Sequence, residues 1–318
     1  MHQGWPDSPR TFPASDHRAP PDLFALPSRL VERGGPAPSE HELLLAWLDR
    51  TDAMVSSGQV SLAAVVGFWR SLGPDYLAGA LQGHALAKPY GYAGDFEMMD
   101  KIYRHQVSSD PRFRGWDLFF HQQPATCAVR NRAPTFASLM QQSLARLRRP
   151  LRVLDVGCGP AHHLAGWLIA NPSASVEILC IDHDTRALER AAQVCRPAGH
   201  RVRFEHANAL RFAPRDTYDV IWSSGLFDYL PDATFTRLAS RLHAALRAGG
   251  EMVLGNFAPD HPSRSYMELV ADWPLRYRDE RDLLRLGARC GASPGKARVG
   301  REGTGVNLFL HIRAERGA

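Results

Sequence analysis

The sequence predicts an α/β fold in which a mostly parallel sheet follows a mainly helical region. From Leu151 onward, strand-like apolar runs alternate with amphipathic helical stretches, the pattern of a parallel sheet with helices between its strands. Two further strand candidates, residues 296–301 and 307–313, close the chain and are joined by a short Gly-rich turn. Upstream, residues 39–145 carry apolar residues at helical spacing.

The chain of 318 residues is long enough for one large domain with an added cap. Residues 1–38 contain many of the 23 prolines and few apolar clusters, which predicts a poorly ordered arm. Residues 39–145 are expected to form a helical cap that carries the substrate region. Residues 146–318 are expected to form the core of the protein.

The composition excludes several classes of protein. No run approaches the roughly 18 apolar residues of a membrane helix, and the N-terminus lacks a basic segment leading into an apolar stretch. The 5 cysteines are widely spaced, which argues against a disulfide framework and a metal site and favours the cytoplasm. The net charge of +5 comes from scattered arginines, which argues against a nucleic-acid partner.

The expected elements of the core follow one another in regular order. Each strand is short and apolar, and each helix has an amphipathic pattern. The expected strands are residues 151–156, 176–181, 202–206, 218–222 and 251–255. The expected helices are residues 161–170, 186–195, 232–246 and 279–290.

The strongest motif is the turn after the first core strand, Asp155-Val156-Gly157-Cys158-Gly159. Glycines at alternate positions allow a sharp turn and let a ligand approach the backbone without a Cβ in the way. A dinucleotide site would carry a third glycine where this chain has His162, which argues against a bound pyrophosphate. Asp182 ends the second strand, where a carboxylate can accept hydrogen bonds from both ribose hydroxyls, with Asp184 as the alternative.

This turn resembles motif I of the class I S-adenosylmethionine (SAM)-dependent methyltransferases. The resemblance implies a Rossmann-like sheet with a C-terminal antiparallel hairpin, SAM as the cofactor, and Asp155 near the methionine amino group. Asn208 stands where the family usually has Asp, and its amide can still pair with the adenine edge. The cofactor-binding residues expected from this resemblance are Asp155, Gly157, Gly159, Asp182, Asn208, Ala209, Ser223 and Arg130.

A second segment, residues 88–99, places tyrosines and carboxylates around two glycines. It resembles a segment of the bacterial methyltransferases that make hydroxy-fatty-acid methyl ester quorum-sensing signals, and the likeness extends from roughly residue 80 to the C-terminus. The resemblance implies methyl transfer to a carboxyl or hydroxyl oxygen of a small molecule. The expected substrate-binding residues are Tyr90, Glu97, Tyr229, Asn256 and Phe257.

The chemistry of the acceptor decides which further groups are needed. A carboxylate acceptor is already ionised and needs only a cationic clamp, for which Arg130 or Arg132 is placed just before the core. For a phenol or amine acceptor a base would help, and His121, His162, His163 and Asp228 are the candidates. The candidate catalytic residues are Tyr92, Asp95, His121 and Asp228.

Other activities remain open at the level of sequence. Methyl transfer to nitrogen or carbon of a natural-product intermediate is the first alternative. A protein or RNA methyltransferase and a non-catalytic SAM-binding regulator are the others. The residues do not decide the oligomeric state.

Overall fold

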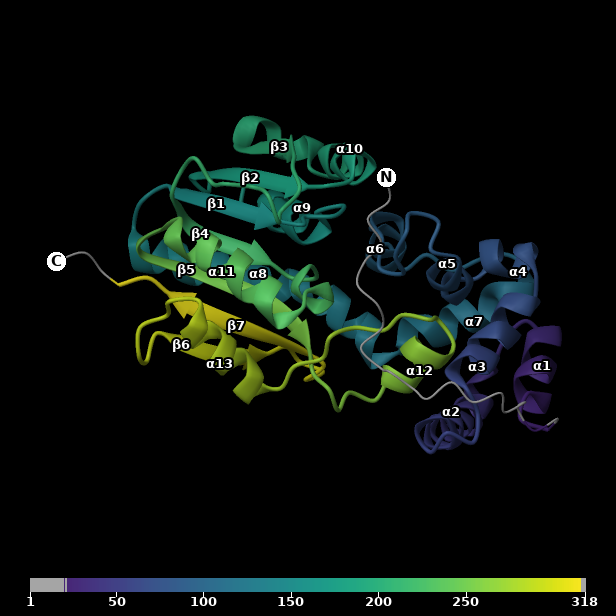
Figure 1. The fold of residues 1–318 in the computed structure, drawn as a ribbon. Coiled ribbons are helices and arrows are strands. Elements are labelled where there is room, and N and C mark those ends of the chain that lie inside the picture. The colour runs from purple at the N-terminus through teal and green to yellow at the C-terminus, as the bar shows by residue number, and fades with distance from the viewer. Residues whose placement is uncertain (1–19, 21, 316–318) are drawn as a thin grey trace. The chain divides into compact units, whose positions relative to one another are not determined.

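The computed structural model describes residue 20 and residues 22–315, and it divides into two compact units (Figure 1). Of the described residues, the helical unit comprises 20, 22–127 and 262–275, and the sheet unit comprises 128–261 and 276–315. The division falls within the helix of residues 124–147, whereas the sequence analysis drew it at 145/146. Most of the expected N-terminal arm, residues 1–19 and 21, lies outside the described residues.

The helical unit consists of short helices, in agreement with the apolar spacing of its sequence. One helix, Ala25–Glu32, lies in the segment expected to be a poorly ordered arm, and its Leu30 is buried. The elements are α1 (Ala25–Glu32), η1 (Pro38–Glu40), α2 (His41–Ser56), α3 (Leu62–Ser71), α4 (Pro74–Gly79), α5 (Leu81–Ala87), α6 (Phe96–Tyr103), α7 (Pro111–Gln122), the start of α8 (Pro124–Leu147) and α12 (Arg264–Leu269).

Aromatic side chains form the core of the helical unit. The ring of Trp69 lies 6.2 Å from that of Trp47, 5.6 Å from Trp116 and 6.4 Å from Tyr76, measured between centroids. Trp69 and Trp116 are completely buried. Each large ring buries much apolar area on folding. These few aromatic residues therefore contribute a large part of the packing between the short helices.

The sheet unit contains one seven-stranded sheet in the order β3-β2-β1-β4-β5-β7-β6. The pairs among β1 to β5 are parallel, and β7 runs antiparallel to both β5 and β6. This confirms the expected α/β fold with a C-terminal antiparallel hairpin. The strands are β1 (Leu151–Val156), β2 (Val176–Asp182), β3 (Val202–His206), β4 (Tyr218–Ser223), β5 (Leu246–Phe257), β6 (Ala297–Arg301) and β7 (Asn307–Arg313).

Helices cover both faces of this sheet and bury its alternating side chains. On one face, α8, α9 and α10 pack against residues such as Val153 and Ile178. On the other face, α11 and α13 pack against residues such as Leu154 and Ile181. The remaining elements of this unit are α9 (His162–Ala170), α10 (Thr185–Val194), η2 (Arg196–Arg201), η3 (Phe227–Tyr229), α11 (Asp232–Ala244) and α13 (Glu280–Arg289).

No helix within the described ranges is both long enough and apolar enough to cross a membrane.

The closest backbone approach near the carboxyl edge of the sheet occurs at Gly255 of β5. A Cβ there would lie 2.5 Å from the carbonyl oxygen of Ser224, a backbone atom that cannot move independently of β4. We expect Gly255→Ala to lower the free energy of unfolding by roughly 1–3 kcal/mol, as overpacking does. Gly166→Ala is the matched control, since its Cβ would meet nothing within 4 Å and alanine favours a helix. Urea unfolding of both variants checks this, and equal stability of the two would contradict it.

Candidate functional site

The turn between β1 and α9 places two glycines at the carboxyl edge of the sheet. Gly157 has φ +67° and Gly159 has φ +54°, backbone conformations that favour glycine. The amides of Gly157 and Cys158 both donate to the carbonyl oxygen of Ile181, at 2.9 and 3.2 Å. The turn is therefore anchored to the end of β2, while Gly157 itself is exposed and open to a ligand.

Asp182 connects this turn to the start of α10. One carboxylate oxygen accepts a hydrogen bond from the amide of Gly159 at 3.0 Å, and the other accepts one from the amide of Asp184 at 3.0 Å. Asp184 in turn accepts from the amide of Arg186 and caps α10. Asp182 is buried but is not the helix cap, and Nδ1 of His183 lies 3.2 Å from the oxygen that accepts from Asp184. The other oxygen, which accepts from Gly159, has a further lone pair at the carboxyl edge.

Asp155 is buried at the end of β1 and is paired with a histidine. The Nε2 atom of His163 lies 3.0 Å from its carboxylate. The ring of His163 packs against Phe136 at 5.0 Å and near Trp222 at 6.1 Å, between centroids. His163 therefore fixes the orientation of Asp155, a role that the sequence analysis did not assign because helical spacing alone says nothing about this contact.

The remaining residues expected at the cofactor differ in exposure. The hydroxyl of Ser223 is buried and donates to the carbonyl oxygen of Val156 at 2.8 Å, which joins the ends of β4 and β1. Asn208 is exposed, and its side-chain oxygen accepts from the amide of Leu210 at 2.9 Å. Its NH₂ group makes no hydrogen bond to the described residues. Ala209 is half-buried.

Asp228 lies in η3 and is almost completely buried. Its carboxylate accepts a hydrogen bond from the amide of Phe257 at 2.7 Å. Burial raises the pKa of Asp228 to about 6, and the nearby charges of Arg132 and Arg278 and the Phe257 amide oppose that rise. The result is a carboxylate that changes charge near neutral pH at the carboxyl end of β4 and β5.

Arg132 of α8 lies beside Asp228 with most of its donors free. Its Nε donates to the side-chain oxygen of Asn307 at 2.9 Å. The guanidinium is 3.7 Å from the carboxylate of Asp228, too far for a hydrogen bond, and lies 5.6 Å over the ring of Phe257. Among the residues that the structure describes, its two terminal nitrogens make no hydrogen bond. Such a buried cation with free donors is suited to an anionic ligand.

Asn256 and Phe257 end β5 and are both buried. The side-chain oxygen of Asn256 accepts from Arg278 at 2.7 Å, and its NH₂ group donates to the carbonyl oxygen of Arg276 at 2.9 Å. Both ends of Asn256 are thus engaged within the sheet unit. Tyr229 and Arg130 are half-buried.

The expected residues of the helical unit form a network of their own. The hydroxyl of Tyr90 donates to Glu97 at 2.8 Å, and Lys101 also lies 2.8 Å from Glu97. Lys101 donates to Nδ1 of His84 at 3.0 Å, so Nε2 of His84 carries the proton that it donates to the buried Asp95. Asp95 also accepts from the amide of Met98 and caps α6. This network of hydrogen bonds holds the segment of residues 88–99 together.

His121 is also engaged within the helical unit. It is buried, its Nε2 donates to the carbonyl oxygen of Gln106 at 2.8 Å, and its ring stacks on His105 at 5.4 Å between centroids. Tyr92 is half-buried.

Within the sheet unit, the structure brings together the ends of β1, β2 and β4 with Asp155, the glycine turn, Asp182 and Ser223. Asp228 and Phe257 meet at the ends of β4 and β5. No group of three or more His, Cys, Asp or Glu side chains arranged to hold a metal ion occurs in the described part of the chain.

Comparisons with known proteins agree with this geometry. Residues 153–250 match the family model described as methyltransferase domain. The chain is 32% identical over 161 residues to trans-aconitate 2-methyltransferase of Streptomyces avermitilis, a match that covers 49% of this chain and 57% of the relative. The enzyme of the same name from Methylobacterium radiotolerans is 31% identical over 147 residues, 44% of this chain and 53% of the relative. The chain thus spans about half the length of the curated relatives it matches.

A crystal structure of a possible exported protein from Bordetella parapertussis has a similar fold. Its TM-score is 0.62 at 21% sequence identity, and the match covers 88% of this chain and 99% of that one. Nearly the whole chain, both units included, therefore has a counterpart of known fold.

The raised pKa of Asp228 predicts a characteristic dependence of stability on pH. An unfolded aspartate has a pKa of about 3.9, whereas the folded value is about 6. Between these values the folded state holds a proton that the unfolded state has lost, so stability decreases as the pH rises through this window. A shift of about two units corresponds to roughly 3 kcal/mol. We expect Asp228→Asn to remove this decrease, since asparagine keeps an oxygen for the Phe257 amide.

Urea unfolding of wild type and Asp228→Asn at several values between about pH 4 and 7 measures the effect. His311 and Arg313 lower the pKa of Glu251 to about 2 although the group is buried. Its effect on stability begins as the pH falls through about 4.3, and it is common to both proteins, so it cancels in the comparison. Asp49→Asn, an exposed substitution on α2, is the control. Parallel pH curves for wild type and Asp228→Asn would contradict the prediction.

Proposed function

We propose that this protein is a SAM-dependent methyltransferase that acts on a small molecule at a carboxyl or hydroxyl oxygen. One observation carries the proposal: two buried carboxylates, Asp155 and Asp182, lie beside a glycine turn with positive φ angles. A third carboxylate, Asp184, caps the next helix. The turn thus offers acceptors and negative charge to whatever it binds.

This charge fits SAM and not a dinucleotide. A pyrophosphate beside Asp155 and Asp182 would meet like charge, which costs free energy in a low-dielectric site. SAM instead carries an ammonium group, a sulfonium and two ribose hydroxyls, all of which suit carboxylate partners. The match of residues 153–250 to the methyltransferase domain supports the same assignment.

The residues of the turn would each hold a different part of SAM. Asp182, oriented by the Gly159 and Asp184 amides, accepts from the ribose hydroxyls. Asp155, oriented by His163, holds the methionine ammonium directly or through water. The backbone of Gly157 and Gly159 would lie under the methionine and ribose. Arg130 would pair with the cofactor carboxylate, Asn208 and Ala209 would contact adenine, and Ser223 would hold the end of β4 in place.

SAM, when bound, supplies a methyl group on a sulfonium, and the protein contributes mainly by holding the acceptor in line with it. The free donors of Arg132 favour a carboxylate acceptor, because a planar guanidinium binds a carboxylate with two parallel hydrogen bonds. The relatives named trans-aconitate 2-methyltransferases support this choice, since trans-aconitate is a carboxylate. The resemblance to hydroxy-fatty-acid methyl ester synthases points to the same class of acceptor.

A carboxylate acceptor needs no base, whereas a hydroxyl acceptor would use Asp228. With a pKa of about 6, Asp228 is mostly ionised at neutral pH and retains some proton affinity. Tyr229 and Phe257 would contact the apolar part of the acceptor. Asn256 supports this region through Arg278. The roles expected for Tyr90, Tyr92, Asp95, Glu97 and His121 stay predictions.

The cofactor assignment predicts that Asp182→Ala weakens SAM binding by roughly 1–3 kcal/mol, because the ribose hydroxyls lose their acceptor. Asp184→Ala is the matched control: it removes the cap of α10 and should leave the affinity for SAM almost unchanged. Isothermal titration calorimetry with SAM measures both. Equal affinity of Asp182→Ala and wild type would remove Asp182 from the site.

The acceptor assignment is tested by incubating the protein and labelled SAM with a metabolite extract. Mass spectrometry then identifies the product that gains a methyl group. We expect this product to regain its original mass in dilute base, because an ester hydrolyses whereas an ether does not. A base-stable product would exclude a carboxylate acceptor.

With that acceptor, Arg132→Lys should raise KM at least about tenfold, since lysine keeps the charge and loses the planar pair of donors. The affinity for SAM should stay the same. Arg237→Lys, the same substitution at an exposed position of α11, is the control. An unchanged KM would show that Arg132 does not hold the acceptor.

A further inference from the structure

The connection from β3 to β4, residues 207–217, crosses the sheet without forming a helix. Parallel strands are usually joined by a helix that covers the sheet face between them. Here the connection packs on the face of α11 and α13 through Ala209 and Phe212. Arg241 of α11 fixes it by donating to the carbonyl oxygens of Leu210 and Phe212, at 2.9 and 3.0 Å. The outer part of this face is therefore covered only by an irregular segment.

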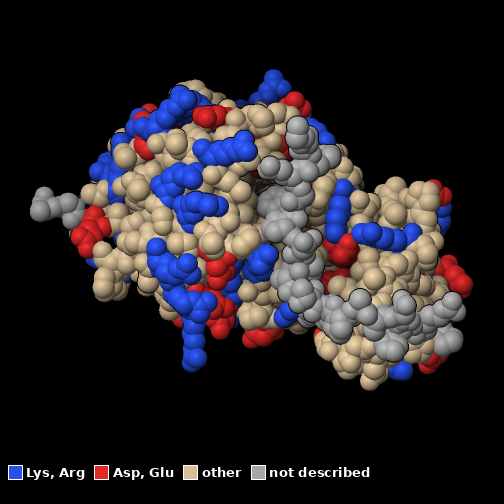
Figure 2. Space-filling view, viewed as in Figure 1, with Lys and Arg blue, Asp and Glu red and all other residues tan. Residues whose placement is uncertain are grey.

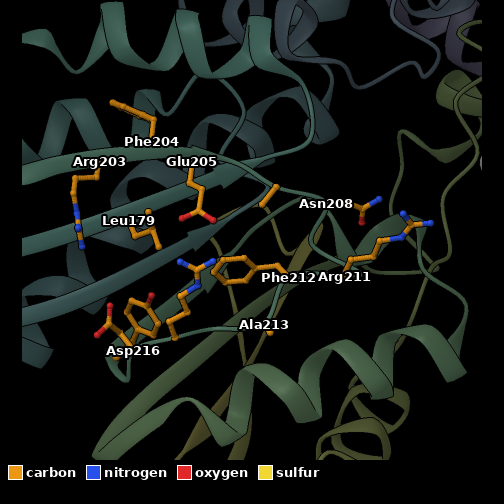
Figure 3. A pocket seen from close by; sticks show the side chains of 12 residues that line it. Leu179, Arg203, Phe204, Glu205, Asn208, Arg211, Phe212, Ala213 and Asp216 are labelled. Carbon is orange, nitrogen blue, oxygen red and sulfur yellow. The ribbon is translucent and has the colours of Figure 1, made fainter.

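A pocket of about 670 Å³ lies under this segment (Figure 3). Its volume falls within the roughly 300–1,000 Å³ of sites that bind small molecules. Leu179 comes from β2, Arg203 and Glu205 come from β3, and Phe212 comes from the connection. Tyr218, the first residue of β4, also lines the pocket.

The hydrogen-bond donors of this pocket are unusually free. The exposed residues Arg203, Arg211 and Arg215 line it, and none of their side chains makes a hydrogen bond or an ion pair within the described residues. Tyr218 is only 4% exposed, and its hydroxyl also makes no hydrogen bond to the described residues. A ligand in the pocket would accept the hydrogen bond of this hydroxyl.

The charge around the pocket favours an anionic ligand. Lys and Arg side chains gather on the face of the sheet unit that carries α11 and α13 (Figure 2). Of the two acidic residues that line the pocket, Asp216 is engaged by Arg152 at 3.3 Å. The other acidic residue, Glu205, forms no ion pair among the described residues. Among the residues that line the pocket, three guanidinium groups without an ion pair therefore outnumber one such carboxylate.

We propose that this pocket binds a nucleotide. Guanidinium groups of Arg203 and Arg215 would hold its phosphate, for which their planar donors are well suited. Phe212 and Leu179 would pack against the base, and Glu205 would accept from the ribose hydroxyls. A bare inorganic anion would leave the apolar wall unused. The pocket shares only Asn208 with the residues proposed to bind SAM, so the site does not depend on the proposed methyltransferase activity.

The experiment is a calorimetric titration of the full chain with AMP, in the presence of saturating S-adenosylhomocysteine so that the SAM site is filled. We expect AMP to bind, and the double variant Arg203→Ala/Arg215→Ala to lose at least about tenfold in affinity, since two charge-assisted contacts are removed. Tyr218→Phe should lose about threefold to tenfold, the value of one hydrogen bond. Arg281→Ala, an exposed substitution on α13, should change nothing.

Three outcomes would overturn the proposal. The first is an absence of AMP binding at millimolar concentration. The second is AMP affinity that survives the double variant but is lost with Asp182→Ala or on addition of S-adenosylhomocysteine, which would place AMP in the SAM site. The third is equal affinity for inorganic phosphate and AMP, which would exclude a contribution from the base. A short RNA that binds more tightly than AMP and is released by the same variants would assign the pocket to RNA instead. The arginine variants test the pocket whether or not S-adenosylhomocysteine binds.

Discussion

The arrangement at the carboxyl edge depends on one hydrogen bond, from the amide of Gly159 to the carboxylate of Asp182. It ties the turn after β1 to the end of β2, and the other oxygen of Asp182 holds the start of α10. Because the carboxylate is buried, these charge-assisted bonds act in a medium that strengthens them. One side chain thereby sets the relative positions of two strands and two helix starts, and with them the surface on which a ligand would rest.

Charge is distributed unevenly along this edge, and the distribution gives each part a different preference. Asp155 and Asp182 make the glycine turn suited to cations and hydroxyls. Arg132, at the ends of β4 and β5, makes that part suited to an anion. Asp228 lies beside Arg132 with a raised pKa, because burial outweighs the attraction of the nearby guanidinium groups. A cationic methyl donor would require the first kind of site, and an anionic acceptor would require the second kind close to it.

The local pattern of the sequence was enough to predict most of the sheet. The bounds of β1, β3 and β7 agree with the predicted ones, because short strand-like runs bounded by turn residues are local signals. β5 begins at Leu246 and not at 251, since its first residues are held by pairing of Leu246 with Tyr218 and carry no apolar alternation. α1 was missed for a related reason: tertiary contacts, such as the bond from Trp47 to the carbonyl oxygen of Leu23, order this region.

The sequence by itself determined the order of strands and helices along the chain, the glycine turn and the acidic residue that ends β2. Each of these depends on residues that are neighbours in the sequence. Only the tertiary structure decided that His163 orients Asp155, that Arg132 lies beside Asp228 with free donors, and that residues 207–217 leave a pocket. Each of these facts depends on side chains that are distant along the chain and meet through packing. Periodicity and spacing describe one element at a time and carry no information about such meetings.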